Sequence, residues 1–276
     1  NTNARRRRLR TLLSAEACVH PATVQDPLSA RIAEVAGYDL AVLPGSLASA
    51  AVLGVPDLIV LTLTEFAEQA RRTTRYTDLA LIADADTGYG NALNVIRTVQ
   101  DYERAGVAAL HLEDQQSPKK CGHLAGKVLV PAEEHAARIA AAVAARTDPD
   151  LVIIARTDAR AVEGLDAAIE RARRYADAGA DVLFVEAPQS MAEIDRVATE
   201  LAGHRLLFNW VEGGRTPPVP LADLADRGFR IVIYPVAALL AASRAVRGVL
   251  ESIREHGTAD IVHMHQIETG IHKSRH

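Results

Sequence analysis

The stretch "ERAGVAALHLED", residues 103–114, contains the pattern that decides the fold of this chain. A helix-like run ends at a glycine, an apolar strand follows, and the strand ends in two acids. The order of helix end, glycine and strand returns in "EVAGYDLAVL" (34–43), "ADAGADVLFV" (176–185) and "ADRGFRIVIY" (225–234). A glycine just past a helix adopts the left-handed conformation without steric cost. Because strands joined through helices run parallel, the repeat predicts a parallel sheet covered by helices on both faces.

Eight short apolar runs with turn residues at their ends are candidate strands. They begin at Cys18, Tyr38, Leu79, Val107, Leu151, Asp181, Arg205 and Arg230. Helical patterns rich in Ala, Glu and Arg lie between them, at 91–104, 131–145, 165–177 and 191–201. Eight such units in roughly 250 residues predict a (β/α)8 barrel of the TIM type. A doubly wound open sheet is the alternative, although no G-x-G-x-x-G opens a helix after the first strand.

No linker rich in Pro, Gly or Ser divides the chain. We therefore predict one barrel domain over residues 1–255, including an N-terminal helix, and a tail or partner-docking arm over 256–276. The N-terminal basic run, Arg5–Arg8, is followed by Leu9, Leu12 and Leu13. This spacing predicts an amphipathic helix with a solvated basic face.

The composition narrows the class of protein. The 276 residues are 49% hydrophobic and 24% charged with a net charge of -4, which is ordinary for a folded globular protein and opposes nucleic-acid binding. Two cysteines do not make a disulfide framework in a chain of this size, which fits a reducing compartment. There is no apolar run long enough to span a membrane and no continuous apolar core of a signal peptide. We expect a cytoplasmic protein that binds neither membrane nor nucleic acid.

Polar residues gather where the predicted strands end. In chain order these ends carry Gly45-Ser46, Asp84 with Asp86, Glu113-Asp114, Arg156 with Asp158, Glu186, and Asn209. All of them are carboxyl ends of strands, and barrel enzymes build their active sites at that rim. The bias of polar residues toward one end of the strands predicts an active site there.

Asp84 and Asp86, two residues apart, point to the same side of their strand. Carboxylates this close repel each other unless a cation or a proton lies between them. Glu113 on the next strand could add a third oxygen, and clustered carboxylate oxygens suit Mg²⁺ or Mn²⁺ rather than zinc. The alternative is that these acids cap the helices that follow.

Two other strand ends could bind an anionic substrate. Arg156 offers a forked donor to a carboxylate, and the alternative is an ion pair with Glu186 or Asp158. Gly45-Ser46 could present backbone N–H groups to an anion, and the alternative is a simple tight turn.

The segment "SPKKCGHLAGK", residues 117–127, places Cys121 between a lysine pair and a histidine. Neighbouring cations lower the pKa of a thiol and make it reactive. The connection is long and contains Gly122 and Gly126, as in loops that close over barrel active sites. We therefore predict that Cys121 acts as an acid/base group tuned by His123 and by the lysine pair, Lys119 and Lys120.

The motifs "ADADTGYGN", "LHLEDQ", "KKCGH" and "IIARTDA" resemble the isocitrate lyase/phosphoenolpyruvate mutase superfamily, in particular its 2-methylisocitrate lyase and 2,3-dimethylmalate lyase branch. The resemblance extends from "DPLSARIAEVAGYDLAVLPGS" to the last strand. It implies a barrel whose last helix swaps between subunits, and a homotetramer built as a dimer of dimers. It also implies Mg²⁺ held largely through water by Asp84, Asp86 and Glu113, with Asp57 nearby.

The resemblance also implies roles for the remaining rim residues. It assigns a 2-oxo acid carboxylate to Ser46 and the Gly45–Leu47 backbone, substrate binding to Arg156 and Asp84, and lesser pocket positions to Glu186 and Asn209. It assigns the acid/base thiol to Cys121, beside Lys120 and His123. "CGHLAGK" in place of the more usual "CGHxGGK", and Pro44 before Gly45, are departures from the pattern that bear on the substrate.

The expected activity is Mg²⁺-dependent cleavage of a carbon–carbon bond. A 2-hydroxy di- or tricarboxylate of the methylisocitrate or 2,3-dimethylmalate type would undergo retro-aldol cleavage to a 2-oxo acid and a carboxylic acid. Oxaloacetate decarboxylation is an alternative, because "DADTGYGNALNVIRTV" also resembles that branch. Phosphonate mutase or hydrolase chemistry fits less well with "EDQ" and a cysteine, and the intact rim residues oppose a purely structural role.

Overall fold

The computed structural model describes residues 1–15, 17–58, 60–120 and 126–258. Within these residues the chain forms eight strands, one for each of the eight apolar runs in the sequence. They are β1 (Ala22–Thr23), β2 (Leu40–Leu43), β3 (Ala80–Asp84), β4 (Ala109–Glu113), β5 (Val152–Thr157), β6 (Val182–Val185), β7 (Leu206–Asn209) and β8 (Phe229–Ile233). Neighbouring strands are parallel and follow one another in chain order.

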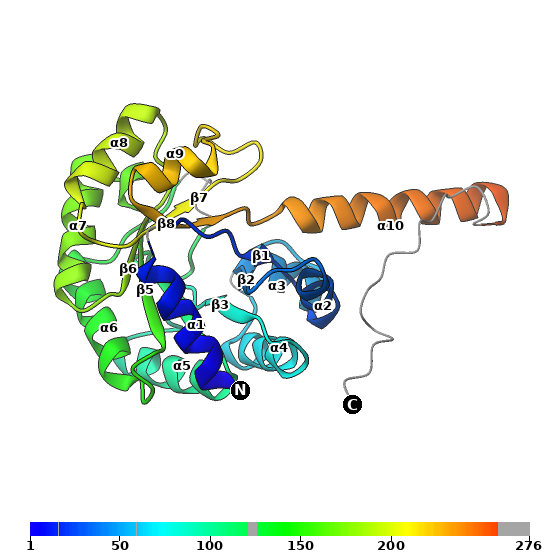
Figure 1. Ribbon diagram of the computed structural model, residues 1–276, viewed down its shortest axis with the longest axis horizontal. Coiled ribbons are helices and arrows are strands. Elements are labelled where there is room, and N and C mark those ends of the chain that lie inside the picture. The colour runs from blue at the N-terminus through cyan, green and yellow to red at the C-terminus, as the bar shows by residue number, and fades with distance from the viewer. Residues whose placement is uncertain (16, 59, 121–125, 259–276) are drawn as a thin grey trace.

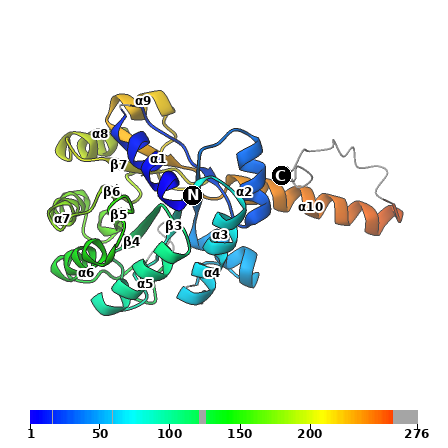
Figure 2. The ribbon, with the colours of Figure 1, turned by 60° about the horizontal axis from the view of Figure 1, so that its bottom comes forward.

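The sheet closes on itself through the residues before β1. Val19 forms a parallel bridge with Ile231 of β8. Its N–H donates to the carbonyl of Arg230 at 2.9 Å, and its carbonyl accepts from the N–H of Val232 at 2.9 Å. The closed ring with its surrounding helices is visible in Figure 1 and, from a second side, in Figure 2. The prediction of a (β/α)8 barrel is therefore confirmed, and the open-sheet alternative is wrong.

Helices alternate with the strands in the described part of the chain. They are α1 (Thr2–Ser14), α2 (Pro27–Val35), α3 (Gly45–Leu53), α4 (Leu63–Tyr76), α5 (Ala92–Arg104), α6 (Ala132–Ala145), α7 (Leu165–Asp177), α8 (Met191–Glu200), α9 (Leu221–Asp226) and α10 (Ala237–His256). The four helices predicted at 91–104, 131–145, 165–177 and 191–201 are confirmed to within one residue at each end. The four repeat glycines have φ between 83° and 99°, as the pattern predicted.

Strand alternation divides the apolar residues into two cores. One set, which includes Leu81, Leu110 and Ile153, packs against the helices. The other set, which includes Ile82, Ile154 and Phe184, fills the inside of the barrel. This second core also contains Leu9 and Leu13, so α1 lies across the N-terminal end of the barrel and closes it. The carboxyl-terminal end of the strands is therefore the end of the barrel at which an active site can form.

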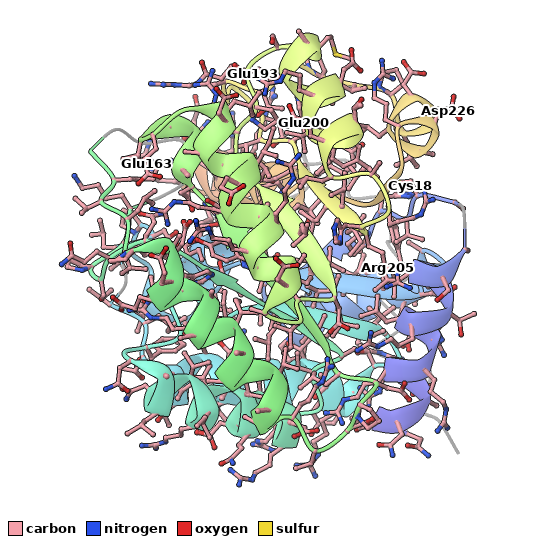
Figure 3. All side chains as sticks on the ribbon, turned by 90° about the vertical axis from the view of Figure 1, so that its left-hand side faces the viewer. Cys18, Glu163, Glu193, Glu200, Arg205 and Asp226 are labelled. Carbon is pink, nitrogen blue, oxygen red and sulfur yellow. The ribbon has the colours of Figure 1, made fainter. Side chains whose placement is uncertain are left out.

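The prediction of a solvated basic face on α1 is wrong in part. Arg6 is 3% exposed and donates to the carbonyls of Val107 and Glu103 and to Asp148. Arg10 likewise donates to the carbonyl of Leu151. These carbonyls precede the strands or begin them, so the arginines hold α1 to the base of the barrel. From the barrel side, Arg205 (labelled in Figure 3) donates to the carbonyl of Leu13 at the end of α1.

The last helix leaves the barrel instead of covering it. α10 extends away from the rest of the molecule in Figure 1, and none of its residues is buried. It exposes Leu240, Val246, Leu250 and Ile253. The helix continues to His256, one residue past the predicted end of the domain at residue 255, and the tail from residue 259 onward lies outside the described residues. Among the described residues, none of the helices is long and apolar enough to cross a membrane.

Candidate active site

The parallel sheet brings the acids of β3 and β4 together at the carboxyl rim. Asp84 is the last residue of β3 and Glu113 the last of β4. Asp86 follows β3 with a left-handed backbone, φ 48°, and its carbonyl accepts the N–H of Glu113 at 2.9 Å. All three acids are buried, with exposed fractions of 5% or less. The predicted acidic group at this rim is therefore present as a structural unit.

Asp84 is held by backbone donors from two directions. Its Oδ1 accepts the N–H of Asp86 at 2.9 Å, and its Oδ2 accepts the N–H of Gly45 at 3.0 Å. A Cβ atom at Gly45 would lie 2.9 Å from Oδ2 of Asp84, so a side chain there would force Asp84 to shift. The alternative that Asp84 and Asp86 cap the next helix is wrong, because Asn91 caps α5 by accepting from Leu93 N at 2.9 Å.

Gly45 and Leu47 are buried in the first turn of α3, and Ser46 is partly exposed. The sequence predicted that this backbone receives a substrate carboxylate. The N–H of Gly45 is directed to Asp84 instead, so any anion at this turn would have to use the N–H groups of Ser46 and Leu47.

Lys119 supplies a buried cation to the acids. Its Nζ lies 2.6 Å from Oδ1 of Asp86 and 3.1 Å from Oδ2 of Asp57, and its side chain is 4% exposed. Burial disfavours the charged ammonium, but Asp86, Glu113 and the other nearby acids raise the pKa of Lys119 well above its ordinary value. Lys119 therefore remains charged inside the site.

The geometry distinguishes Lys119 from its neighbour Lys120, whose catalytic role stays a prediction. Lys120 is exposed, and its backbone N–H and carbonyl are held by the side-chain amide of Gln115. The same amide donates to Oε1 of Glu113 at 3.1 Å. Two adjacent lysines cannot be ranked from sequence, because the direction of each side chain depends on how the loop backbone is anchored.

Arg156 lies at the centre of a second group of charges. Its Nε and Nη2 donate to the two oxygens of Asp158 at 3.0 and 3.1 Å. Its Nε lies 3.3 Å from Oε2 of Glu113, and its Nη2 lies 3.9 Å from Oε1 of Glu186. The sequence left open an ion pair of Arg156 with Glu186 or with Asp158, and the contact with Asp158 is the shorter of the two. Burial opposes the charge of Arg156, but Asp158, Glu186 and Glu113 raise its pKa well above the ordinary value.

Glu186 follows β6, and Asn209, the last residue of β7, lies beside it. The Nδ2 of Asn209 donates to both carboxylate oxygens of Glu186 at 3.2 Å. Beyond β7, four buried polar atoms have no hydrogen-bond partner among the described residues: Asn209 Oδ1, Trp210 Nε1, Glu212 Oε2 and Thr216 Oγ1. The last three of these residues were not among the predicted site residues, although the polar run "NWVEGGRTP", which starts at the last residue of β7, was a usable signal.

Cys121 and His123 lie outside the described residues, and their roles stay predictions. The chain is described again from Gly126. Nζ of Lys127 lies 3.2 Å from Oδ1 of Asp158 and is almost fully buried. The segment that contains the cysteine is thus attached at both of its described ends to rim acids, through Lys119 and through Lys127.

The carboxylates of the rim outnumber its basic side chains, which bears on whether a divalent cation could bind there. Among the described residues of the rim, six carboxyl groups face three basic side chains. The acids are Asp57, Asp84, Asp86, Glu113, Asp158 and Glu186, and the bases are Lys119, Lys127 and Arg156. The carboxylates are buried, and Asp86 Oδ1 and Glu113 Oε2 are in ion pairs with Lys119 at 2.6 Å and with Arg156 at 3.3 Å. A buried surplus of carboxylate charge over these cations fits a hard divalent ion.

Water molecules would have to complete the coordination of a divalent ion at this rim. Within the described residues there is no group of three or more His, Cys, Asp or Glu side chains arranged to bind an ion directly. Mg²⁺ in proteins usually keeps several waters and takes only one or two carboxylates. That Asp84, Asp86 and Glu113 hold Mg²⁺ largely through water stays a prediction.

The two neighbouring aspartates differ in proton affinity. Burial raises the pKa of Asp86 to about 6, with the charge of Asp84 adding to the shift and Lys119 opposing it. Burial also opposes ionisation of Asp84, but His111, Lys119 and the N–H of Asp86 bring its pKa below the ordinary value. Burial lowers the pKa of His111, which lies 3.5 Å from Asp84. A second cation near Asp86 would favour its ionised form.

Together the closed barrel, the acidic rim and its buried arginine define a (β/α)8-barrel enzyme. Residues 9–254 match the family model described as phosphoenolpyruvate phosphomutase. The 2,3-dimethylmalate lyase of Eubacterium barkeri is 42% identical over 91% of this chain and 86% of its own length. The 2-methylisocitrate lyase of Halalkalibacterium halodurans is 45% identical over 92% of this chain and 83% of its own.

Solved structures of lyases and hydrolases from the same superfamily also align with this chain. The crystal structure of 2,3-dimethylmalate lyase aligns with a TM-score of 0.89 at 40% identity, covering 96% of this chain and 88% of that one. Oxaloacetate acetylhydrolase with 3,3-difluorooxalacetate aligns with a TM-score of 0.89 at 39% identity, covering 93% and 88%. Phosphonopyruvate hydrolase with oxalate and Mg²⁺ aligns with a TM-score of 0.84 at 34% identity, covering 97% and 93%.

The chain belongs to the phosphoenolpyruvate phosphomutase family, in the superfamily that it shares with isocitrate lyase. Its relatives named as lyases align over most of their length, and the chain is an enzyme of the carbon–carbon lyase class.

Proposed function

We propose that this protein is a Mg²⁺-dependent lyase for a 2-hydroxy di- or tricarboxylate of the methylisocitrate or 2,3-dimethylmalate type. Retro-aldol cleavage would give a 2-oxo acid, pyruvate or glyoxylate, and a carboxylic acid. One observation carries the proposal: the buried surplus of carboxylates on β3 and β4 lies directly beside Arg156. Such a site can hold a cation and an anionic substrate next to each other.

Asp84, Asp86 and Glu113 would hold the metal, with Asp57 and Lys119 at its edge. Bound there, Mg²⁺ would acidify the substrate hydroxyl and screen the charge of the adjacent carboxylate. The crystal structure of phosphonopyruvate hydrolase with oxalate and Mg²⁺ supports the choice of metal, because that protein shares 34% identity with this chain.

The chain's own residues then have three tasks. Arg156 binds a substrate carboxylate through the part of its guanidinium that Asp158 leaves open. The ammonium of Lys119 stabilises negative charge that develops near Asp86. A base in the site takes the proton of the substrate hydroxyl, whose oxygen becomes the carbonyl of the 2-oxo acid as the carbon–carbon bond breaks. The electron pair of that bond stays on the carbon of the departing acid, and the thiol of Cys121 donates a proton to that carbon.

Selectivity for the second half of the substrate is assigned to the loop after β7. Trp210 Nε1 and Thr216 Oγ1 can donate hydrogen bonds, while Asn209 Oδ1 can accept one. These atoms are buried without partners among the described residues, which is costly unless a ligand or water satisfies them. A substrate carboxylate or hydroxyl group could do so.

The test is a comparison of substrates. Purified protein with MgCl₂ would be offered 2-methylisocitrate, 2,3-dimethylmalate, isocitrate and oxaloacetate, and formation of 2-oxo acid would be followed with lactate dehydrogenase. We expect cleavage of a branched 2-hydroxy acid that is abolished by EDTA and restored by MgCl₂. Absence of cleavage of all three hydroxy acids at any Mg²⁺ concentration would refute the assignment.

Oxaloacetate is the second candidate substrate. The structural match to oxaloacetate acetylhydrolase has the same TM-score, 0.89, as the match to 2,3-dimethylmalate lyase. The product distinguishes the reactions, since hydrolysis of oxaloacetate gives oxalate and acetate whereas decarboxylation gives pyruvate and CO₂. Phosphonate chemistry is less favoured because the chain carries "EDQ" at 113–115 and a cysteine at 121.

We also propose that the protein is a homotetramer in which α10 packs on a neighbouring subunit. The support is that α10 leaves its own barrel and exposes four large apolar side chains. Light scattering after gel filtration measures the mass directly, and a monomer at micromolar concentration would contradict the proposal. A cytoplasmic location stays a prediction from the composition.

A further inference from the structure

Asp158 holds Arg156 along one edge of the guanidinium group. Its two oxygens accept from Nε and Nη2, the pair of donors on the side of the fork, at 3.0 and 3.1 Å. Asp158 is 1% exposed, so this pair is shielded from water. A bidentate pair fixes direction as well as distance. The rotation of the guanidinium about its long axis is therefore set by Asp158.

This edge is not the one that a substrate would use. Within the described residues, the hydrogen bonds of Arg156 come from Nε and Nη2, and Nη1 is left at the open end of the fork. The side chain of Arg156 keeps 10% of its surface exposed. The end of the fork, Nη1 with Nη2, is therefore the edge that can receive a carboxylate.

The plane of the guanidinium is fixed by an aromatic ring. The Cζ of Arg156 lies 5.1 Å from the centre of the Phe184 ring, within the range of a cation–π contact. The two residues are register partners on β5 and β6, so the barrel itself sets their separation. Asp158 sets the rotation and Phe184 sets the tilt, which leaves Arg156 little freedom.

Asp158 is in turn fixed from below by Asp114. The N–H of Asp158 donates to Oδ1 of Asp114 at 2.9 Å, and the Thr157 hydroxyl donates to Oδ2 at 2.7 Å. The Tyr175 hydroxyl also donates to Oδ2, at 2.8 Å, and Asp114 is fully buried. The position of Asp158 is therefore built into the rim and does not depend on a ligand.

Lys127 balances the charge of Asp158. Its ammonium lies 3.2 Å from Oδ1, the same oxygen that accepts from Nη2 of Arg156. One carboxylate thus serves two cations, so Lys127 shares the charge of Asp158 with Arg156. Glu113 and Glu186 also lie near Arg156, at 3.3 and 3.9 Å, so the second cation on Asp158 limits how far the surrounding acids offset the guanidinium.

We propose that Asp158 is a positioning residue that directs the Nη1/Nη2 end of Arg156 toward the substrate carboxylate and ties Lys127, at the end of the cysteine-containing segment, to the same anchor. The proposal rests on the proposed function in one respect, that the ligand is a carboxylate. It adds a residue that acts through Arg156 and does not touch the reacting atoms.

The test uses oxalate as the probe, because oxalate binding does not require turnover. Isothermal titration calorimetry in MgCl₂ would compare wild type with Asp158→Asn and Lys127→Met. The control is Asp166→Asn, since Asp166 is an exposed acid paired only with Arg196 in the described structure. Circular dichroism melting would verify the fold of each variant, and KM and kcat would be measured with the best substrate found.

In Asp158→Asn an amide N–H₂ replaces one of the two accepting oxygens and faces a cation. We expect the oxalate Kd and the KM to rise at least tenfold while kcat changes less than threefold, and no change in Asp166→Asn. A purely structural role would lower the melting temperature without this split between KM and kcat. In Lys127→Met, Asp158 loses its second cation and the rim loses one positive charge, and we expect a severalfold rise in the oxalate Kd.

Three results would overturn the proposal. An oxalate Kd within twofold of wild type in Asp158→Asn refutes it while the proposed function stands. If Asp158→Asn does not fold, an unchanged Kd in Lys127→Met refutes it in the same way. If wild type binds no oxalate in MgCl₂, the carboxylate function fails, and the positioning role fails with it.

Discussion

The ammonium of Lys119 lies 2.6 Å from Oδ1 of Asp86 in the buried rim of the barrel. This contact joins the segment that carries the cysteine to the acids that end β3. The ion pair gives Lys119 two functions, to compensate the surplus of carboxylates and to fix the start of the segment. Lys119, rather than its neighbour Lys120, is therefore the lysine expected to matter for catalysis.

The two lysines form a matched pair for mutagenesis. We predict that Lys119→Met lowers kcat by roughly 10²- to 10³-fold, the range found when one donor that stabilises developing charge is removed. Lys120→Met should stay within about twofold, because that side chain is exposed. Steady-state kinetics measures both, and equal losses in the two variants would contradict the assignment.

The metal assignment predicts a specific loss in Asp86→Asn. Removing one carboxylate charge should raise the Mg²⁺ concentration for half-maximal activity by roughly 10- to 100-fold, by analogy with other changes at the surroundings of metal sites. Calorimetric titration with MgCl₂ gives the same comparison without turnover. Asp101→Asn, on the outer face of α5, is the control. A wild-type Mg²⁺ response in Asp86→Asn would exclude Asp86 as a ligand.

Cys121 is expected to act as an acid in the lyase reaction. For Cys121→Ser we predict a loss of cleavage of roughly 10²- to 10⁴-fold, as for removal of a general acid, with oxalate binding retained. Cys18→Ser, a change of the partly buried cysteine near the base of the barrel, should leave turnover unchanged. Wild-type turnover in Cys121→Ser would remove the thiol from the mechanism and favour oxaloacetate decarboxylation.

His135 makes the fold sensitive to acid. It is fully buried against the ring of Tyr175, and burial together with Arg138 and Arg171 lowers its pKa to about 3. The folded state thus keeps His135 neutral, while the unfolded state binds a proton below its ordinary pKa of 6.5. The contribution of neutral His135 to the free energy of unfolding is complete above pH 6.5, and it decreases as the pH drops from 6.5 toward 3.

The loss attributable to His135 should be about 2 kcal/mol between pH 7.5 and pH 5. We predict that His135→Phe loses less free energy of unfolding over this range than wild type does, as measured by urea titration. His204→Gln, a change of an exposed histidine, should follow wild type. Parallel curves for wild type and His135→Phe would show that His135 is not responsible.

The base of the barrel offers a test that is independent of activity. We predict that Arg6→Ala destabilises the protein by about 3 kcal/mol, since it leaves Asp148 and two carbonyls without a buried donor. Arg7→Ala, the exposed neighbour, should change stability by less than about 0.5 kcal/mol. Equal effects in thermal melting would show that α1 is held by its leucines alone.

Much of the fold could be predicted from the sequence because each barrel strand is marked by features of its own short stretch of sequence. Each strand is an apolar run, four of the eight follow a helix-ending glycine and six end at polar or glycine residues of the rim, and these signals do not depend on distant contacts. The acids at the ends of β3 and β4 were predictable for the same reason, since neighbouring parallel strands place their carboxyl ends together.

The errors concern side chains whose direction is set by distant partners. Lys119 and Lys120 are equivalent in sequence, and only Asp57 and Asp86 distinguish them. Arg6 belongs to a basic run that is typical of a solvated surface, yet it binds carbonyls about a hundred positions away. The role proposed for Asp158 involves an ion pair with Lys127, 31 positions earlier in the chain, and no spacing pattern in the sequence predicts that ion pair.

The contact between Gly45 and Asp84 limits how this enzyme can change. Even a methyl group at position 45 would collide with an acid oxygen of the site, so the turn after β2 is closed to ordinary variation. Adaptation to new substrates must then occur where backbone and acids are independent, as in the stretch from Trp210 to Pro220. A library randomised at 210, 212 and 216 should yield altered preference, whereas one at 45 should yield only inactive protein.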